Sequence, residues 1–169
     1  TMREGSLLAR QELYGEFVLM EGLVYDQWDP DFYVKPRAEW PTQVPRRVIA
    51  GVDFGFTNPS AFCIEGLDEQ GRRYTMHELY ERHLSEQQLV SRAIDIANEY
   101  HPYRWECDSE DPRWIDAMRR AGLPVVKARK TKGSTRDISS GLGLCYAALG
   151  QPGVGPQRFF VDPSCGNFQ

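Results

Sequence analysis

Two aspartates that each end an apolar segment are the residues of this sequence best placed to do chemistry. Asp53 closes the segment "RRVIAGVD", and the turn residues Gly55, Asn58 and Pro59 follow it. Asp108 closes "YRWECD" in the same way. An apolar run bounded by turn residues predicts a strand in a sheet covered on both faces. A lone carboxylate there is costly unless a cation or hydrogen bonds compensate it.

The chain from residue 46 onward predicts a mixed α/β sheet in which three hairpin-connected strands precede alternating helices and strands. We expect strands over residues 48–53, 61–67, 73–82, 104–108 and 124–128, and a last one within "QRFFV". We expect helices over residues 85–101, 111–122 and 136–149. Ser85 is a suitable N-cap, and Pro112 and Gly122 stand where a helix begins and ends.

If the first and fourth strands are parallel neighbours, Asp53 and Asp108 extend from adjacent strand ends into one crevice. Two close carboxylates repel unless a cation lies between them, and oxygen-only ligands favour Mg²⁺ or Mn²⁺ over zinc. A pair of such ions about 3.5–4 Å apart is the usual arrangement for phosphodiester cleavage. The structural alternative is that Asp53 caps its turn through Thr57 or Asn58, and that Asp111 caps the following helix.

A basic stretch interrupts a chain whose net charge is −4. Between residues 117 and 136 there is no acid, whereas seven Lys and Arg residues occur: Arg119, Arg120, Lys127, Arg129, Lys130, Lys132 and Arg136. Such a stretch is either a solvated surface or a strip that contacts phosphates. In the second case, the residues from Lys127 to Arg136 would hold a DNA backbone without reading its sequence.

Composition indicates an intracellular globular protein. Apolar residues make up 41% of the 169 residues and charged residues 26%, which is ordinary for that class. The four cysteines form no CxxC pair, so we expect reduced thiols. No apolar run approaches the ~20 residues of a membrane helix, so we expect no membrane partner. The polar N-terminus is unlike a signal peptide.

Residues 1–45 differ in character from the rest of the chain. Residues 21–45 hold five aromatic residues and four prolines in an irregular pattern. We expect residues 1–45 to be a linker or docking segment and residues 46–169 to be one domain.

The segments "GVDFGFTNPSAFCIEGLDEQGRRYTMHELYER" and "ECDSEDPRWIDAMRRAGLPVVKARKTKGS" resemble the nuclease domain of tailed-bacteriophage terminase large subunits, the DNA-packaging motors that cut concatemeric genomes. The resemblance covers nearly the whole chain. It rests on a D-x-G-x-T-N-P-x-A pattern, a D-x-x-x-P element, a G-L-P-V turn and the basic loop, in that order. The segment "LYGEFVLMEGLVYDQWDPDFYV" is similar to the family's connection between ATPase and nuclease parts.

The resemblance implies an RNase H-like endonuclease in which Asp53 and Asp108 are catalytic and bind two divalent cations, Mg²⁺ or Mn²⁺. A third acid, on a helix after the last strand, would lie beyond residue 169, and Asp162 does not match it. We therefore expect a domain cut short before its last helix, with doubtful activity on its own. Implied partners are double-stranded DNA, the portal protein, the small terminase subunit and the ATPase domain of the same chain, all in the host cytoplasm.

Four alternatives stay open at this point, one of which is an unrelated binding domain of the same fold class. A Holliday-junction resolvase or transposase-type nuclease would share the fold and the acid pair. A non-catalytic packaging or docking module would share the fold alone. "GVDFGFTN" also resembles the first phosphate loop of actin-like ATPases and sugar kinases, although the chain shows no second glycine-rich hairpin. No GxxxxGK[ST] motif occurs either, so we expect the ATPase part of the motor to be absent from this sequence.

Overall fold

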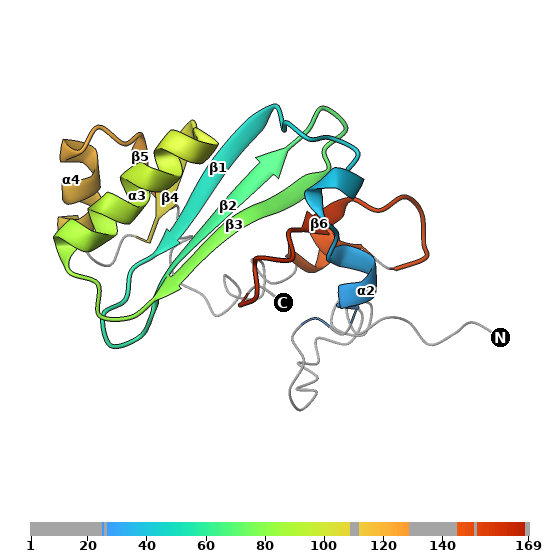
Figure 1. Ribbon diagram of the computed structural model, residues 1–169, viewed down its shortest axis with the longest axis horizontal. Coiled ribbons are helices and arrows are strands. Elements are labelled where there is room, and N and C mark those ends of the chain that lie inside the picture. Colours follow the sequence, from blue (N-terminus) through green and yellow to red (C-terminus); the bar gives the residue numbers. More distant parts are fainter. Residues whose placement is uncertain (1–24, 26, 109–111, 129–144, 151, 168–169) are drawn as a thin grey trace, which may run out of the picture.

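The fold is organised around a six-stranded sheet with strand order β5-β4-β1-β2-β3-β6 (Figure 1). The computed structural model describes residues 25, 27–108, 112–128, 145–150 and 152–167. The strands are β1 Arg47–Asp53, β2 Ser60–Leu67, β3 Arg73–Glu81, β4 Arg104–Cys107, β5 Val125–Lys127 and β6 Phe159–Val161. The helices are α2 Pro30–Tyr33, the 3₁₀ turn η1 Arg37–Glu39, α3 Glu86–Tyr100 and α4 Pro112–Arg120. Residues 145–149 are also helical.

The strand pairing is the mixed arrangement predicted from the sequence. β1, β2 and β3 pair antiparallel, whereas β4 pairs parallel with β1 and β5 pairs parallel with β4. β6 adds to the far edge, parallel with β3. The predicted α/β class is therefore confirmed, with strand ends within one or two residues of expectation. Of the expected helix over residues 136–149, residues 136–144 lie outside the described part of the chain.

Helices α3 and α4 cover one face of the sheet (Figure 1). α3 begins with a capping box in which the Ser85 hydroxyl accepts the Gln88 backbone N–H and the Gln88 side chain accepts the Ser85 backbone N–H. It ends at Tyr100, and the following C-cap residue, His101, adopts the left-handed conformation at φ 50°. The helix buries Leu89 and Ile96 against the sheet.

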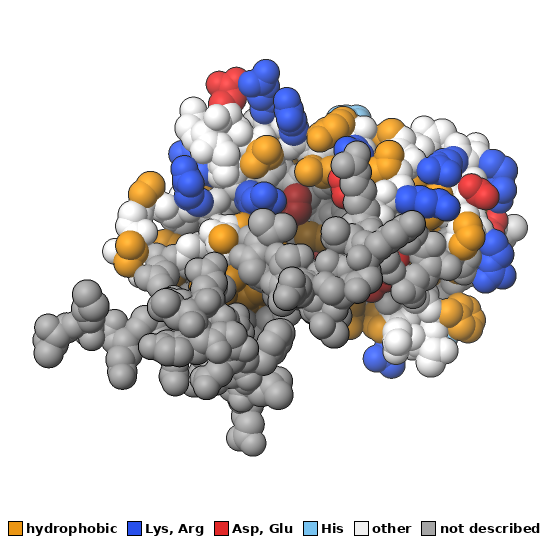
Figure 2. Space-filling model, turned by 180° about the vertical axis from the view of Figure 1, so that it is seen from behind, with side chains coloured by type: hydrophobic (Ala, Val, Ile, Leu, Met, Phe, Trp, Pro, Cys, Tyr) orange, Lys and Arg blue, Asp and Glu red, His pale blue; other side chains and the backbone are white. Residues whose placement is uncertain are grey.

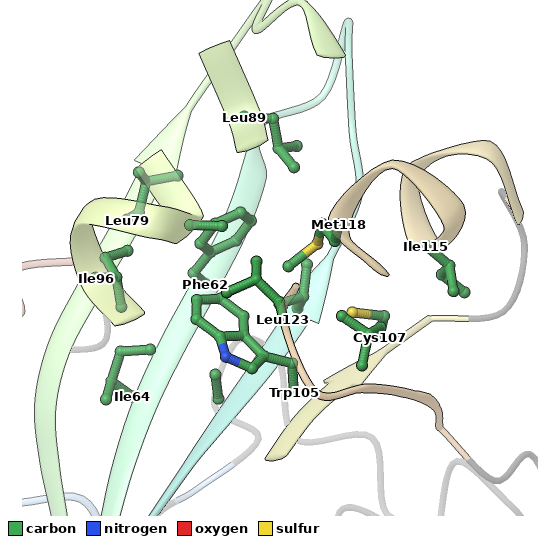
Figure 3. Close-up of a cluster of buried hydrophobic side chains, with 14 of the residues drawn as sticks. Phe62, Ile64, Leu79, Leu89, Ile96, Trp105, Cys107, Ile115, Met118 and Leu123 are labelled. Atoms are coloured by element: carbon green, nitrogen blue, oxygen red, sulfur yellow. The ribbon is translucent and has the colours of Figure 1, made fainter. Parts of the chain in front are cut away.

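Alternation along the strands supplies the sheet side of this core. Val52, Phe62, Trp105 and Cys107 are all buried on the face toward α3 and α4. Phe62 and Trp105 meet edge to face with ring centroids 5.9 Å apart, between side chains from both helices (Figure 3). Because strand side chains alternate, the residues between these core positions face the other side of the sheet.

The described residues between 25 and 45 pack against the β3–β6 edge of the sheet. Tyr33 is fully buried near Phe159, and Trp40 lies against Tyr74 with ring centroids 5.1 Å apart. The backbone N–H of Lys35 donates to a carbonyl of β6 at 3.0 Å. This part of the predicted linker thus completes a small second core, and the domain boundary at residue 46 stays a prediction.

Arg37 fixes that segment to the sheet. Its guanidinium donates to Asp162 at 2.6 Å, to the Tyr100 hydroxyl at 3.3 Å and to the backbone carbonyl of Met76. It also lies over the Trp40 ring, 5.8 Å from the centroid. Burial opposes ionisation of Asp162, but hydrogen bonds from Ser164 and Arg37 outweigh it and lower the pKa of that carboxyl.

Two further features bear on the sequence predictions. All four cysteines are free thiols. Within the described residues, no helix combines the length and apolar character that crossing a bilayer requires.

The hairpin between β2 and β3 depends on a buried carboxylate. Asp68 accepts the Tyr74 hydroxyl at 2.7 Å, the Arg72 Nε at 2.6 Å and the backbone N–H of Gln70 at 2.9 Å. Burial alone would raise the pKa of Asp68, but these hydrogen bonds to Tyr74 and Arg72 hold it well below its usual range. The charged carboxylate is therefore the form that stabilises the folded state.

We expect Asp68→Asn to lower the free energy of unfolding at pH 7 by about 1–3 kcal/mol, because buried donors lose a charged acceptor. A depressed folded-state pKa stabilises above the unfolded value of about 3.9 and loses that effect as pH falls toward the folded value. Urea titrations of the parent and of Asp68→Asn at pH 7 and at lower pH should therefore show that the difference between their free energies of unfolding narrows on acidification. Glu69→Gln, at an exposed neighbouring position, is the control. A difference that does not change with pH would contradict this account.

Candidate metal and nucleic-acid site

The parallel pairing of β1 and β4 places Asp53 and Asp108 on adjacent strand ends. The register runs to Val52 opposite Cys107, and the Asp108 backbone N–H donates to the Val52 carbonyl at 3.0 Å. The ladder thus continues to the next pair of positions, Asp53 and Asp108. Neighbouring strands lie about 4.8 Å apart, so the two aspartates are close neighbours at the carboxyl edge of the sheet.

Both aspartates belong to the face away from α3 and α4. Val52 and Cys107, the residues before them, are buried in the helix-side core, and alternation turns the next residue of each strand to the opposite face. Asp53 is exposed and Asp108 is half-buried. The sequence prediction that the two acids meet at one crevice edge therefore agrees with the strand register, whereas their metal-binding and catalytic roles stay predictions.

The same face carries further carboxylates. Two positions before Asp53, Gly51 pairs with Glu106 of β4 on one side and with Cys63 of β2 on the other, and Cys63 pairs with Glu78 of β3. Glu106 and Glu78 therefore share the face of the aspartates. Figure 2, which views the molecule from behind, shows acidic side chains near the middle of this view. An acidic face of this kind favours cations at its surface.

Glu106 and a further carboxylate on this face, Glu65, have specific partners. Glu106 forms an ion pair with Arg104 at 2.9 Å. Glu65, one row further, accepts the Thr75 hydroxyl at 2.6 Å. Burial raises the pKa of Glu65 despite that hydrogen bond. Glu65 is therefore inclined to be neutral, and Glu106 shares its charge with Arg104.

The loop after β1 is shaped by a close backbone approach. The Ser60 hydroxyl accepts the Gly55 N–H at 3.2 Å and donates to the Gly55 carbonyl at 2.7 Å. A Cβ atom on Gly55 would lie 2.4 Å from the carbonyl oxygen of Asn58, so no larger residue fits without displacing the loop. Phe54, next to Asp53, stacks on Trp114 of α4 with centroids 6.0 Å apart. Both contacts fix the backbone that presents Asp53.

Of the predicted DNA-binding residues, Lys127 is described and Arg129, Lys130, Lys132 and Arg136 lie outside the described residues. Lys127 is exposed at the end of β5 and pairs with Cys107, not with Asp108. It is Ala128 that follows beside Asp108, through an N–H donated to the Cys107 carbonyl at 2.8 Å. Lys127 thus lies at the same end of the sheet as the acids, but its position opposite Cys107 puts it on the face toward α3 and α4, not on the face of Asp108.

Three residues at this end of the sheet were not singled out by the sequence analysis. Glu106 shares the face of Asp108, and its i, i+2 spacing was the signal that could have identified it. Phe56 and Tyr80 are large apolar side chains that are more than half exposed. An aromatic residue inside a glycine- and proline-containing turn was the available sign for Phe56.

Two other features delimit the site. Among the residues that the structure describes, no three His, Cys, Asp or Glu side chains form a group that could hold a metal ion. A hollow of about 440 Å³ lies at the other end of the sheet, lined by residues that include Arg46, Arg47, Tyr100 and Tyr103. Because β1 begins there and ends at Asp53, this hollow is separate from the aspartates.

No protein-family model matches the sequence, and no curated protein matches it. Several solved structures share its fold. The large terminase of a thermophilic bacteriophage, in complex with ADP, superposes with a TM-score of 0.76 at 20% identity, over 98% of this chain and 40% of that one. The nuclease domain of the bacteriophage P22 large terminase gives a TM-score of 0.67 at 17% identity, over 88% of this chain and 76% of that one.

A third structure, the large terminase nuclease domain of bacteriophage SPP1 with bound manganese, gives a TM-score of 0.54 at 21% identity, over 76% of this chain and 68% of that one. The chain has the fold of a large terminase nuclease domain. This terminase nuclease fold is RNase H-like, as the sequence resemblance implied. The chain spans 40% of the length of the thermophilic-phage large terminase described above, which is in complex with ADP.

The turn after β1 supplies a test of how Asp53 is positioned. We expect Gly55→Ala to lower the free energy of unfolding by about 1–3 kcal/mol, because the added methyl overlaps backbone atoms of Asn58 and Pro59. The matched control is Gly51→Ala, since a Cβ there meets its nearest atom at an ordinary 3.9 Å. Urea denaturation of both variants measures the difference. Equal stabilities would mean that the turn adjusts freely and does not constrain Asp53.

Proposed function

We propose that this chain is the metal-dependent DNA endonuclease domain of a phage DNA-packaging terminase, which cuts concatemeric viral DNA by two-metal phosphodiester hydrolysis. The supporting observation is that Asp53 and Asp108 occupy neighbouring parallel strand ends. The fold that carries them is shared with terminase nuclease domains, one of which is described with bound manganese.

The donor set fits a hard divalent cation. Asp53 and Asp108 offer carboxylate oxygens, and Mg²⁺ is commonly held by one or two protein carboxylates together with substrate phosphates and water. When bound, such ions polarise the phosphate and make water a stronger nucleophile. A second ion would need an additional acid, as the family resemblance implies.

The chain's own residues divide the remaining work. Asp53 and Asp108 provide the negative charge that fixes the cations at the carboxyl edge of the sheet. Lys127 and the basic residues that follow it, Arg129, Lys130, Lys132 and Arg136, hold the phosphate backbone of double-stranded DNA without reading sequence. Coupling to the portal protein, the small subunit and an ATPase domain of the same chain belongs to this proposal by resemblance alone.

Replacing Asp53 tests the metal role directly. Asp53→Asn keeps the side-chain shape but removes one of two neighbouring negative charges. We expect it to melt at or slightly above the parent temperature in EDTA, because a repulsion is relieved. We also expect loss of the Mn²⁺-induced rise in melting temperature that binding to the folded state causes in the parent. In a longer chain that carries the third acid, cleavage should be abolished.

The control for this experiment is Asp95→Asn, an exposed aspartate on α3, which should keep the Mn²⁺ response. Thermal scans of the three proteins in EDTA and then in Mn²⁺ decide the outcome. If Asp53→Asn melts well below the parent in EDTA, then Asp53 makes a structural contact and the metal assignment is wrong.

The basic segment is tested through the salt dependence of DNA binding. Replacing Lys130 and Lys132 with alanine should weaken binding similarly for unrelated sequences, and should flatten the log–log salt slope by up to about two. Replacing Arg46 and Arg47, at the opposite end of the sheet, removes the same charge as a control. The proposal predicts a flatter slope for the first pair than for the second. An unchanged slope for the lysine variant would assign those residues to a solvated surface.

A further inference from the structure

Two large apolar side chains are exposed at the end of the sheet that carries the aspartates. Phe56 is 59% exposed and Tyr80 is 52% exposed. We call these two residues the aromatic pair. Exposing a large ring to water forfeits the stabilisation that burial would give. The contacts of Phe56 and the strand position of Tyr80 show how the fold keeps these rings at the surface.

Phe56 is held in place by the loop that follows β3. The His83 backbone N–H donates to the Phe56 carbonyl at 3.0 Å, and the two rings meet edge to face with centroids 5.3 Å apart. His83 adopts a left-handed backbone conformation at φ 57°. Such a conformation is costly for a non-glycine residue and concentrates at functional sites. Phe56 is three positions after Asp53, so their Cα atoms lie within about 11 Å of each other.

Tyr80 lies in the same cross-strand row as Asp53. Asp53 pairs with Ala61, and Ala61 pairs with Tyr80. Residues directly opposite each other share one face of a sheet, so Asp53 and Tyr80 lie on the same face, roughly 10 Å apart. The residue between them is Ala61, whose side chain is a single methyl group.

A DNA strand fits this geometry better than a compact ligand does. Nucleotides repeat about every 3.4 Å along the axis of one strand of a duplex, so 10 Å corresponds to roughly three nucleotides. A strand whose scissile phosphate lies at Asp53 and Asp108 would therefore bring neighbouring sugars and bases within reach of the rings. Aromatic side chains stack on the bases of single strands irrespective of sequence. On a duplex, where the base faces are occupied, the same rings can pack on the sugars.

We propose that Phe56 and Tyr80 bind the DNA strand on the nucleotides next to the cleaved phosphate, by apolar contact with its sugars and bases. This inference rests on the proposed nuclease function. It adds a substrate-positioning contact that does not depend on charge, in contrast to the basic segment. The acidic face repels phosphates, and uncharged rings offer a way to hold the strand against it.

The test uses the complete chain and a short DNA duplex as probe, with Ca²⁺ present to neutralise the acids. We expect Phe56→Ala and Tyr80→Ala each to weaken binding by roughly three- to tenfold, because the apolar contact of the ring with the strand is lost. The log–log salt slope should stay at the parental value, because no phosphate contact is lost. Phe56→Trp and Tyr80→Phe should bind like the parent, since they keep a ring at each position. Tyr103→Ala, which removes a 53% exposed ring at the other end of the sheet, is the control.

Each outcome has a definite meaning. Binding of Phe56→Ala and Tyr80→Ala equal to that of Tyr103→Ala overturns the inference while leaving the nuclease proposal intact, and points to a protein partner for the rings. Weaker binding with a flattened salt slope also overturns it, because charge would then have been disturbed. A parent that binds no duplex DNA overturns this inference together with the proposed function. Loss of binding in Phe56→Trp as well would show that loop geometry, not the ring, is responsible.

Discussion

The parallel pairing of β1 with β4 is the interaction on which the site depends. It is a short ladder, from Ile49 opposite Arg104 to Val52 opposite Cys107, yet it alone brings together two acids that are far apart in sequence. The pairing is maintained from one side, where Val52 and Cys107 are buried beneath α3 and α4. A slip by one residue would turn the core residues outward and the aspartates inward. The hydrophobic core therefore fixes the register, and the register fixes the acids.

Much of this arrangement could be predicted because local sequence and tertiary structure agree. The apolar run before Asp53, the Ser85 cap and the Pro112–Gly122 helix limits each act through neighbours in sequence. The far edge could not be predicted in the same way. The placement of β6 beside β3, and the Arg37 contacts with Asp162, Met76 and Tyr100, join residues up to 125 positions apart. No periodicity in the sequence encodes such pairings.

The site was predicted in part for the same reason. Asp53 and Asp108 each end an apolar segment, which is a local signal, and the crossover from β3 through α3 brings β4 beside β1 as its parallel neighbour. The exposure of Phe56 and Tyr80 depends instead on what packs over them, which only the assembled fold decides. Lys127 shows a similar limit. Its place in the sequence predicts the correct end of the sheet, but its pairing with Cys107 puts it on the face opposite to that of Asp108.

The acidic face sets a conflict between stability and function that the fold resolves by separating the two faces of one sheet. Glu106, Glu78 and the two aspartates gather on one face, where mutual repulsion disfavours folding in the absence of cations. The centre of the other face is built from apolar side chains such as Phe62 and Trp105, packed under two helices (Figure 3). Because burial on that face does not depend on charge, it can hold the acids in place before any cation arrives. Preorganised acids of this kind need little rearrangement when they bind a cation, and that is the condition under which clustered negative charge becomes useful.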